Sequence, residues 1–221
     1  MAFLEVIKNS SLNKNYVIEV SASDCGQNET HGNCIISILK GDIRFTNNNI
    51  TNNKCKNYAS CFSNIYGSSG TFNFSTFREN NQTNGYSFRL GSSSISLSQT
   101  FSYCNVIGNR CGTDNSSVLF YCTFKTDVQC CIFLYNIAKY MFGQSVTTLF
   151  ISDSYVESTS TTRLGTVTFS NLRDNYELNK FNHFYTENCF KDKSIVITNK
   201  LSCLSKFVKP FISGLFSSKQ S

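Results

Sequence analysis

The chain has 221 residues, enough for one domain with a substantial apolar core, and only 15% of the residues are charged. Phe, Val, Ile, Thr and Tyr alternate with Asn, Gly and Ser, whereas helix-favouring residues are under-used, so the composition excludes a disordered or mainly helical chain and predicts an all-β fold. The net charge is +6, but residues 190–221 carry six Lys and one Asp, and the nearly neutral remainder excludes a basic nucleic-acid groove there.

Residues 1–33 are predicted to be an N-terminal cap. The stretch 16–23, YVIEVSAS, alternates as a strand does, and the polar loop DCGQNETHGN follows it. A solenoid needs such a cover because the open edge of its first turn would otherwise pair with another molecule. The first twenty residues lack the charged and then apolar pattern of a signal peptide, and no run of about 18 apolar residues predicts a transmembrane helix.

Three nine-residue segments define a repeat. They are FNFSTFREN (72–80), FSYCNVIGN (101–109) and VQCCIFLYN (128–136), and they can be superimposed without a gap. Each has an apolar residue at the first and sixth places and Asn at the ninth place. Their spacing of 29 and then 27 residues predicts one turn of a solenoid per repeat.

A parallel solenoid gives each place of the repeat a structural meaning. Stacked turns lie about 4.8 Å apart, so equivalent residues stand on one another. Residues at the first, third and sixth places, such as Phe72, Phe74 and Phe77, are therefore predicted to point inward. Asn at the ninth place is predicted to lie where the chain turns, because Asn tolerates left-handed backbone angles and can bond to the Asn of the next turn. We expect a structural Asn ladder rather than a row of ligand-binding side chains.

The same frame extends the repeat region over residues 34–190. Upstream it fits 45–53, and downstream it fits 150–158, 167–175 and 180–188. The spacing of the sixth places then falls to 22, 17 and 13 residues. The last turns are therefore predicted to be truncated or out of register.

The segments FNFSTFREN and FSYCNVIGN, with Gly- and Ser-containing loops between them, resemble the degenerate repeats of right-handed parallel β-helix proteins of the pectate-lyase-like type. They are most similar to the surface β-helix repeats of protists and to the polymorphic outer-membrane adhesins of bacteria. The resemblance covers about residues 34–175. It implies a single right-handed parallel β-helix with an extracellular binding or adhesive role, directed at carbohydrate or protein on a surface.

Residues 191–221 are predicted to be a basic C-terminal cap or tail. The segment 204–216, LSKFVKPFISGLF, has apolar residues at nearly helical spacing, with Lys206 and Lys209 on another side. Pro210 would kink a helix here or restrict it to short turns. We expect a partly helical cap on the last turn, or alternatively an amphipathic segment at a membrane surface.

The 11 Cys do not form a metal-binding pattern. There is no CxxC pair, and the two His, His31 and His183, lie far apart in the sequence, so no zinc site is predicted. Several Cys fall in strand-like segments, where a free Cys behaves as a small buried apolar residue. Disulfides are the alternative if the protein is exported. These strand-like positions are Cys34, Cys104, Cys122, Cys130 and Cys131.

One group of carboxylates has the composition of an active site. Superposing the frames puts Glu157, Asp174 and Glu187 in one column at the eighth place, with Arg173 adjacent. A β-helix lyase or glycoside hydrolase needs such clustered carboxylates on neighbouring turns. The column is not acidic throughout, since its upstream members are Asn52, Glu79, Gly108 and Tyr135.

No other motif predicts catalysis or a cofactor. Neither His lies in a recognisable motif, no GxSxG sequence occurs, and the Gly residues are isolated turn formers rather than phosphate loops. We therefore predict a non-enzymatic β-helix that binds carbohydrate or protein as a surface or adhesin-like module. The alternatives are a carbohydrate-active enzyme that uses the acidic column, and a cytoplasmic scaffold with reduced Cys.

Overall fold

The computed structural model describes residues 2–7, 14–26, 28, 31–66, 69–145, 147–162 and 165–180. The chain divides into a unit of Met1–Phe184 and a unit of Tyr185–Ser221, and all described residues belong to the first unit. The predicted C-terminal cap or tail, 191–221, lies outside the described residues, as does the amphipathic segment 204–216.

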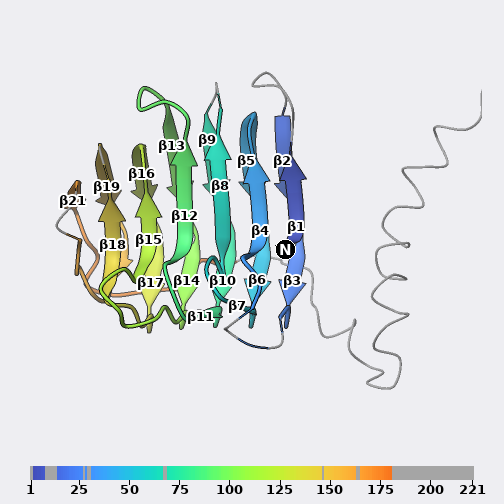
Figure 1. Cartoon of the computed structure of the whole chain (residues 1–221). Coiled ribbons are helices and arrows are strands. Elements are labelled where there is room, and N and C mark those ends of the chain that lie inside the picture. The colour runs from blue at the N-terminus through green and yellow to red at the C-terminus, as the bar shows by residue number, and fades with distance from the viewer. Residues whose placement is uncertain are drawn as a thin grey trace, which may run out of the picture. The chain divides into compact units, whose positions relative to one another are not determined.

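The described residues form a parallel β-solenoid without a helix, as predicted (Figure 1). The chain visits three sheets in turn, and each strand pairs in parallel with the equivalent strands of the previous and next turns. Sheet A contains β1 (Ala2–Ile7), β4 (Cys34–Leu39), β8 (Cys61–Ile65), β12 (Tyr86–Ser92), β15 (Val118–Cys122) and β18 (Tyr140–Gln144). Sheet B contains β2 (Lys14–Ile18), β5 (Asp42–Thr46), β9 (Gly70–Asn73), β13 (Ser98–Ser102), β16 (Lys125–Gln129), β19 (Thr148–Ser152) and β21 (Thr166–Ser170). Sheet C contains β3 (Ser21–Ser23), β6 (Asn49–Thr51), β10 (Thr76–Arg78), β14 (Asn105–Ile107), β17 (Ile132–Leu134) and β20 (Tyr155–Val156). A short fourth sheet pairs β7 (Lys54–Cys55) with β11 (Asn81–Gln82).

The N-terminal segment is itself a turn of the solenoid. β1 pairs with β4, β2 with β5, and β3 with β6, all in parallel. The boundary predicted between residues 33 and 34 therefore does not separate two architectures. The strands of this segment follow the same backbone path as those of the next turn. They therefore pair with β4, β5 and β6 and satisfy the backbone hydrogen-bonding groups at that edge.

The core is a set of stacked apolar columns, as the repeat predicted. At the sixth place, Phe77 pairs with Val106 and Val106 with Phe133, and all three side chains are at most 2% exposed. At the first place, the ring of Phe72 stacks on that of Phe101 at a centroid distance of 6.1 Å. Burying one such ring removes a large apolar area from water, so these columns are the main source of stability.

The third place of the repeat points outward, and the prediction that it points inward is wrong. Phe74, Tyr103 and Cys130 have positive φ values of 49°, 51° and 53°. The chain turns there from sheet B to sheet C, and the left-handed residue directs its side chain to the outside of the corner. Phe74 and Tyr103 are 42% and 45% exposed, and their rings stack on each other at 5.3 Å on the surface.

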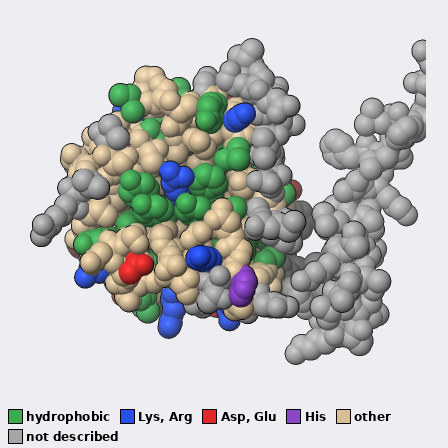
Figure 2. Space-filling view, in the orientation of Figure 1, with side chains coloured by type: hydrophobic (Ala, Val, Ile, Leu, Met, Phe, Trp, Pro, Cys, Tyr) green, Lys and Arg blue, Asp and Glu red, His purple; other side chains and the backbone are tan. Residues whose placement is uncertain are grey.

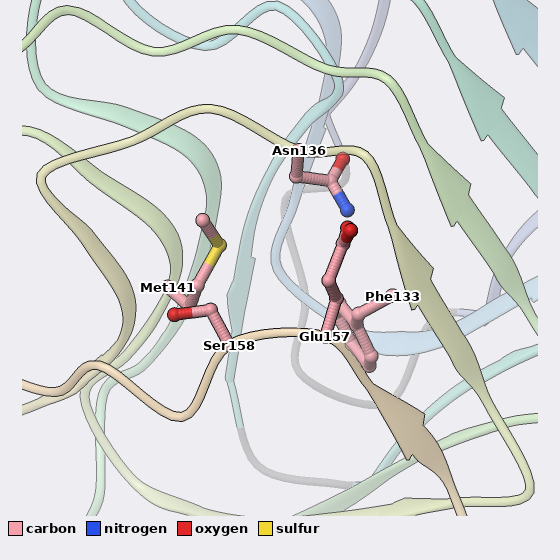
Figure 3. Close-up of a pocket in the computed structure, with 5 residues that line it drawn as sticks. All are labelled: Phe133, Asn136, Met141, Glu157 and Ser158. Atoms are coloured by element: carbon pink, nitrogen blue, oxygen red, sulfur yellow. The ribbon is translucent and has the colours of Figure 1, made fainter. Parts of the chain in front are cut away.

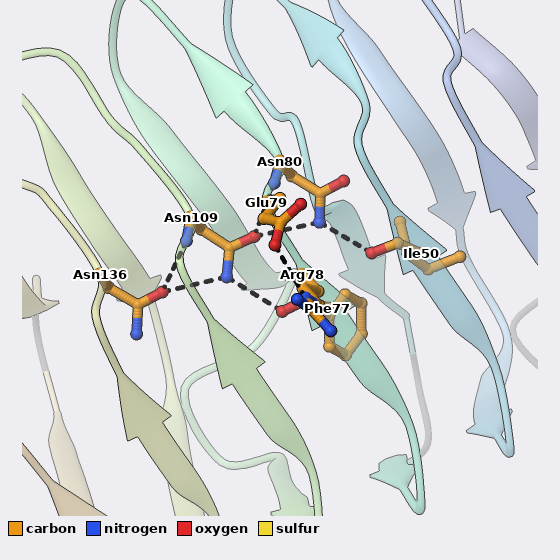
Figure 4. Close-up of polar contacts among 7 residues, drawn as sticks. All are labelled: Ile50, Phe77, Arg78, Glu79, Asn80, Asn109 and Asn136. Carbon is orange, nitrogen blue, oxygen red and sulfur yellow. Dashed lines mark hydrogen bonds and ion pairs between the residues drawn. The ribbon is translucent and has the colours of Figure 1, made fainter.

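Asn at the ninth place forms the predicted ladder (Figure 4). The Oδ1 atom of Asn109 accepts hydrogen bonds from the backbone N–H and the Nδ2 of Asn80, each at 3.0 Å. Its own Nδ2 donates to Asn136 Oδ1 in the next turn and to the carbonyl of Phe77 in the previous turn. The left-handed residue is not this Asn but the one before it, such as Glu79 with a φ of 54°.

A second ladder holds the corner between sheets B and C. The backbone N–H of Cys104 donates to Cys131 Sγ at 3.4 Å, and that of Cys131 donates to Ser154 Oγ at 3.0 Å. Ser154 Oγ in turn donates to the carbonyl of Ser152, two residues earlier in its own turn. Side chains at the fourth place thus satisfy corner N–H groups that no strand pairs. This is a structural use of two Cys that the repeat alone does not reveal.

The frames predicted after residue 150 are shifted. Val128 pairs with Ile151 rather than Phe150, and Ile151 pairs with Phe169 rather than Val167. The frame therefore begins one residue later than predicted in 150–158 and two residues later in 167–175. The last turns are also shorter, with 23 and then 18 residues between these paired positions. The frame 180–188 extends beyond the described residues.

The corrected frame predicts opposite effects for two Phe residues only three positions apart. Phe77→Ala is expected to lower the free energy of unfolding by about 3–5 kcal/mol, because it opens a cavity in a fully buried column. Phe74→Asn is expected to change it by less than about 1 kcal/mol, because Asn tolerates the left-handed angle and the ring is on the surface. Urea denaturation followed by circular dichroism measures both. Equal losses would contradict the outward position of the third place.

The Asn ladder predicts a large effect for one amide. Asn109→Ala is expected to lower the free energy of unfolding by about 3 kcal/mol, because the buried N–H groups of Asn80 lose their acceptor. The matched control is Asn115→Ala in an exposed loop, for which the expected change is below about 0.5 kcal/mol. The same denaturation experiment compares the two variants, and similar small losses in both would show that the ladder contributes little.

Candidate binding surfaces

The structure does not bring the predicted acidic column together. Glu157 directly follows β20, at the seventh place of the corrected frame, whereas Asp174 takes the sixth place of the following turn. Arg173 occupies the fifth place, where its backbone N–H donates to the carbonyl of Ser154. Glu187 lies outside the described residues. Within the described ranges no three His, Cys, Asp or Glu side chains are placed to hold a metal ion.

Glu157 has a structural partner instead, and it also lines a small cavity (Figure 3). Its carboxylate accepts the backbone N–H of Tyr135, whereas the equivalent N–H groups of Glu79 and Gly108 donate to backbone carbonyls of the next turn. The side chain thus replaces a carbonyl at the point where the following turn departs from the repeat. The adjacent cavity of about 70 Å³ is lined by Phe133, Asn136, Met141, Glu157 and Ser158, and it is far smaller than typical ligand pockets.

The Cys side chains that the structure describes are almost all core residues. Eight of the nine are buried, and Cys130 is the partly exposed one. Burial raises the pKa of Cys55, Cys111 and Cys122 to about 12, and it raises the pKa of Cys104 well above its usual value. A thiol with such a pKa stays protonated at neutral pH, and a protonated thiol is a poor nucleophile and a poor metal ligand.

A polar groove of about 490 Å³ runs along the corner that follows sheet C. Two columns flank it, one at the eighth place of the repeat and the other at the tenth. Lys54 pairs with Asn81, and Asn81 forms a bridge to Arg110, which aligns the second column across three turns. The lining residues are Asp24, Asn52, Lys54, Glu79, Asn81, Gly108 and Arg110.

The groove is open and balanced in charge. Its two carboxylates, Asp24 and Glu79, and its two cations are exposed to solvent, so the formal charges cancel. Glu79 forms an ion pair of 2.9 Å with Arg78, and Asp24 accepts a hydrogen bond from Ser23 Oγ. Asn81 Oδ1 is buried and has no hydrogen-bond partner among the described residues. The groove therefore offers charged and neutral hydrogen-bonding groups, both donors and acceptors, without a strong net electrostatic field.

The eighth place is shaped by the left-handed corner. Asp24, Asn52 and Glu79 have φ values of 55°, 54° and 54°, which turn their side chains away from the core. Gly108 follows them with a φ of 62°, and a Cβ added to it would lie 3.5 Å from Glu79 Cγ. The missing side chain leaves the groove open beside the Glu79 carboxylate.

A second surface feature covers the outer face of sheet A. Hydrophobic side chains gather there around a basic one (Figure 2). Tyr86 stacks on Tyr121 at 4.2 Å, Tyr58 stacks on Phe62 at 5.0 Å, and the Arg89 guanidinium lies 5.4 Å from the centre of the Phe62 ring. The ring faces are thus covered by one another and by Arg89. We interpret this strip as cross-strand pairs that stabilise the sheet.

Comparisons with protein-family models, with curated proteins and with solved structures found no match. The resemblance to pectate-lyase-like and adhesin repeats therefore stays a prediction beyond the parallel solenoid itself. Among the described residues, no helix has the length and apolar character needed to cross a bilayer.

Sequence reasoning found only half of the groove. The nine-residue frame aligns Asn52, Glu79 and Gly108 in one column, but acidity alone does not mark that column as a binding site. Lys54, Asn81 and Arg110 fall one residue beyond the nine-residue frame. A ten-residue frame aligns them, since each directly follows a ninth-place Asn.

The raised thiol pKa values predict a loss of stability at alkaline pH. The unfolded chain ionises its thiols near pH 9, whereas folded Cys55, Cys111 and Cys122 stay protonated up to about pH 12. Their contribution is therefore complete below pH 9 and is lost as the pH rises towards 12, by about 1.4 kcal/mol per pH unit for each thiol. Urea denaturation under reducing conditions from pH 7.5 to 10.5 measures this slope.

Cys122→Ala provides the internal comparison for that measurement. The variant lacks one of the buried thiols, so its free energy of unfolding is expected to fall less steeply above pH 9 than that of the unmodified protein. The two proteins differ only in this thiol. The difference between their curves therefore excludes the contribution of the Tyr and Lys side chains, which titrate in both proteins. Parallel curves would show that Cys122 ionises equally in both states.

Proposed function

We propose that this chain is a non-enzymatic β-solenoid that binds carbohydrate along its polar groove, as a module of a surface or adhesive protein. The observation that carries the proposal is the lining of the groove. Carboxylates, amides and cations alternate along two columns over successive turns, in an open site with no net charge. Such a set matches a neutral polyhydroxyl ligand, whose hydroxyl groups both donate and accept hydrogen bonds.

The groove favours binding over catalysis. A glycosidase needs one carboxyl group with a raised pKa as its general acid, and burial against apolar side chains commonly provides that shift. Asp24 and Glu79 are instead exposed, and Glu79 is paired with a cation. The alternative of a carbohydrate-active enzyme therefore has less support than a binding role. A rigid core under the groove also keeps its two columns in fixed positions, which lowers the entropy lost on binding.

Gly108→Asn tests the groove without disturbing the corner. Asn52 occupies the equivalent position in the turn before that of Glu79, with a φ of 54°. The Gly108→Asn variant is therefore expected to fold. The introduced side chain would fill the space beside Glu79, and the affinity for a groove ligand is expected to fall about tenfold or more. Isothermal titration against a panel of neutral and acidic oligosaccharides measures the affinity, and denaturation confirms that the variant is folded.

Asp127→Asn is the matched control, because Asp127 lies on sheet B, away from the groove, and its loss should leave the affinity unchanged. If no saccharide in the panel binds, or if Gly108→Asn binds as tightly as the unmodified protein, the proposal is wrong. Release of new reducing ends or unsaturated products from a bound oligosaccharide would favour the enzymatic alternative instead.

A further inference from the structure

The chain continues from the last turn into a segment that crosses the outer face of sheet C. This segment, residues 176–179, is called the strap below. The ring of Tyr176 lies 5.1 Å from that of Tyr155 in β20, and its hydroxyl is 3.4 Å from the hydroxyl of Tyr135. Three residues later, Asn179 reaches Asn105 in β14. The strap therefore runs back over β20, β17 and β14, against the order in which the chain built them.

The contact between Asn179 and Asn105 involves a complete amide pair. Asn105 Nδ2 donates to the carbonyl of Asn179 at 2.8 Å, and Asn105 Oδ1 accepts its backbone N–H at 3.1 Å. A side-chain amide thus binds the backbone of one strap residue as a neighbouring strand would. Asn179 Nδ2 adds a third bond to the carbonyl of Cys130 at 3.1 Å, which makes Asn the matching side chain there.

Asn105 lies beneath the strap, to which both groups of its side-chain amide are hydrogen-bonded. It occupies the fifth place of the repeat, on the outer face of sheet C, yet it is 4% exposed. Thr76 pairs with it in the previous turn, and Asn49 pairs with Thr76 in the turn before that, and both of these side chains are partly exposed. The face therefore contains a buried amide whose two hydrogen-bonding groups are both occupied by a backbone.

The strap itself is held by few contacts. Tyr176 and Leu178 are 41% and 44% exposed, and the strap contains no helix or strand. Segments with few buried apolar contacts open locally far more often than the core does. Opening of the strap would expose the Asn105 amide and the Tyr155 ring together.

We propose that the outer face of sheet C at β14, β17 and β20 is a peptide-binding surface, which the strap occupies in cis. Its ligand is a polypeptide segment with Tyr followed three residues later by Asn. Asn105 binds the backbone at the Asn position, the Cys130 carbonyl accepts the Asn side chain, and Tyr155 contacts the aromatic ring. None of the described residues that contact the strap lines the polar groove, which lies at the corner that follows sheet C.

A labelled peptide tests the proposal in the full chain. The probe is a fluorescein-labelled peptide with the sequence of residues 173–180, RDNYELNK. The double variant Tyr176→Ala with Asn179→Gly removes both strap side chains that contact the surface, and it leaves only the backbone pairing of residue 179 with Asn105. Both positions lie outside the core. Fluorescence anisotropy is expected to show at least about tenfold tighter binding of the probe to this variant, because the unmodified strap competes at the high effective concentration of a tethered ligand.

Asn105→Asp, added to the double variant, distinguishes binding through the amide pair from nonspecific binding of the probe. Aspartate has the same shape but cannot donate to the peptide carbonyl, so probe affinity is expected to fall about tenfold. Asn49→Asp makes the same change two turns away on the same face and should leave the affinity within about twofold. Failure of the double variant to bind the probe, or equal binding with and without Asn105→Asp, would overturn the proposal.

Discussion

The fold depends on satisfying the backbone N–H groups at its corners. Strands in a parallel solenoid pair with the turns above and below, but a turning chain leaves groups that this pairing does not reach. Two ladders of side chains supply the missing partners, one of ninth-place Asn and one of fourth-place Ser and Cys. An unpaired buried N–H costs about as much as a lost hydrogen bond, so both ladders stabilise the turns that contain them.

The same corners determine which side chains reach the surface. At the third and eighth places the backbone adopts left-handed angles, and the side chains point away from the core. The eighth place can therefore vary from Asp24 to Asn52, Glu79 and Gly108 without disturbing the apolar columns. The ladder beneath stays constant, while the residues on either side of it form the polar groove. Stability and the proposed carbohydrate binding thus depend on alternating positions of one corner.

The sequence predicted the features that repeat and missed those that depend on backbone angle. The sequence predicts the columns at the first, sixth and ninth places because the same residue types recur there at nearly equal spacing. Phe74 was placed inside because apolar character normally indicates burial, but a corner angle overrides it. After residue 150 the predicted register is wrong because Phe150 and Val167 are apolar residues one and two positions before the true first places. The true ninth places, Thr159 and Glu177, are not Asn and so do not mark the frame. The groove was only half visible because its second column lay outside the frame.

The end of the Asn ladder shows how the chain adapts where its repeat stops. Beyond Asn136, the Glu157 carboxylate supplies the acceptor that a backbone carbonyl provides in earlier turns. On the outer face, the Asn105 amide pairs with the backbone of Asn179 in the same way that Asn109 pairs with its neighbours inside. The inner pairing cannot be released without unfolding, because it is surrounded by packed turns. The pairing of Asn105 with Asn179 also joins a side-chain amide to a backbone, but the strap that covers Asn105 is exposed. Under our proposal, this pairing opens while the solenoid stays intact.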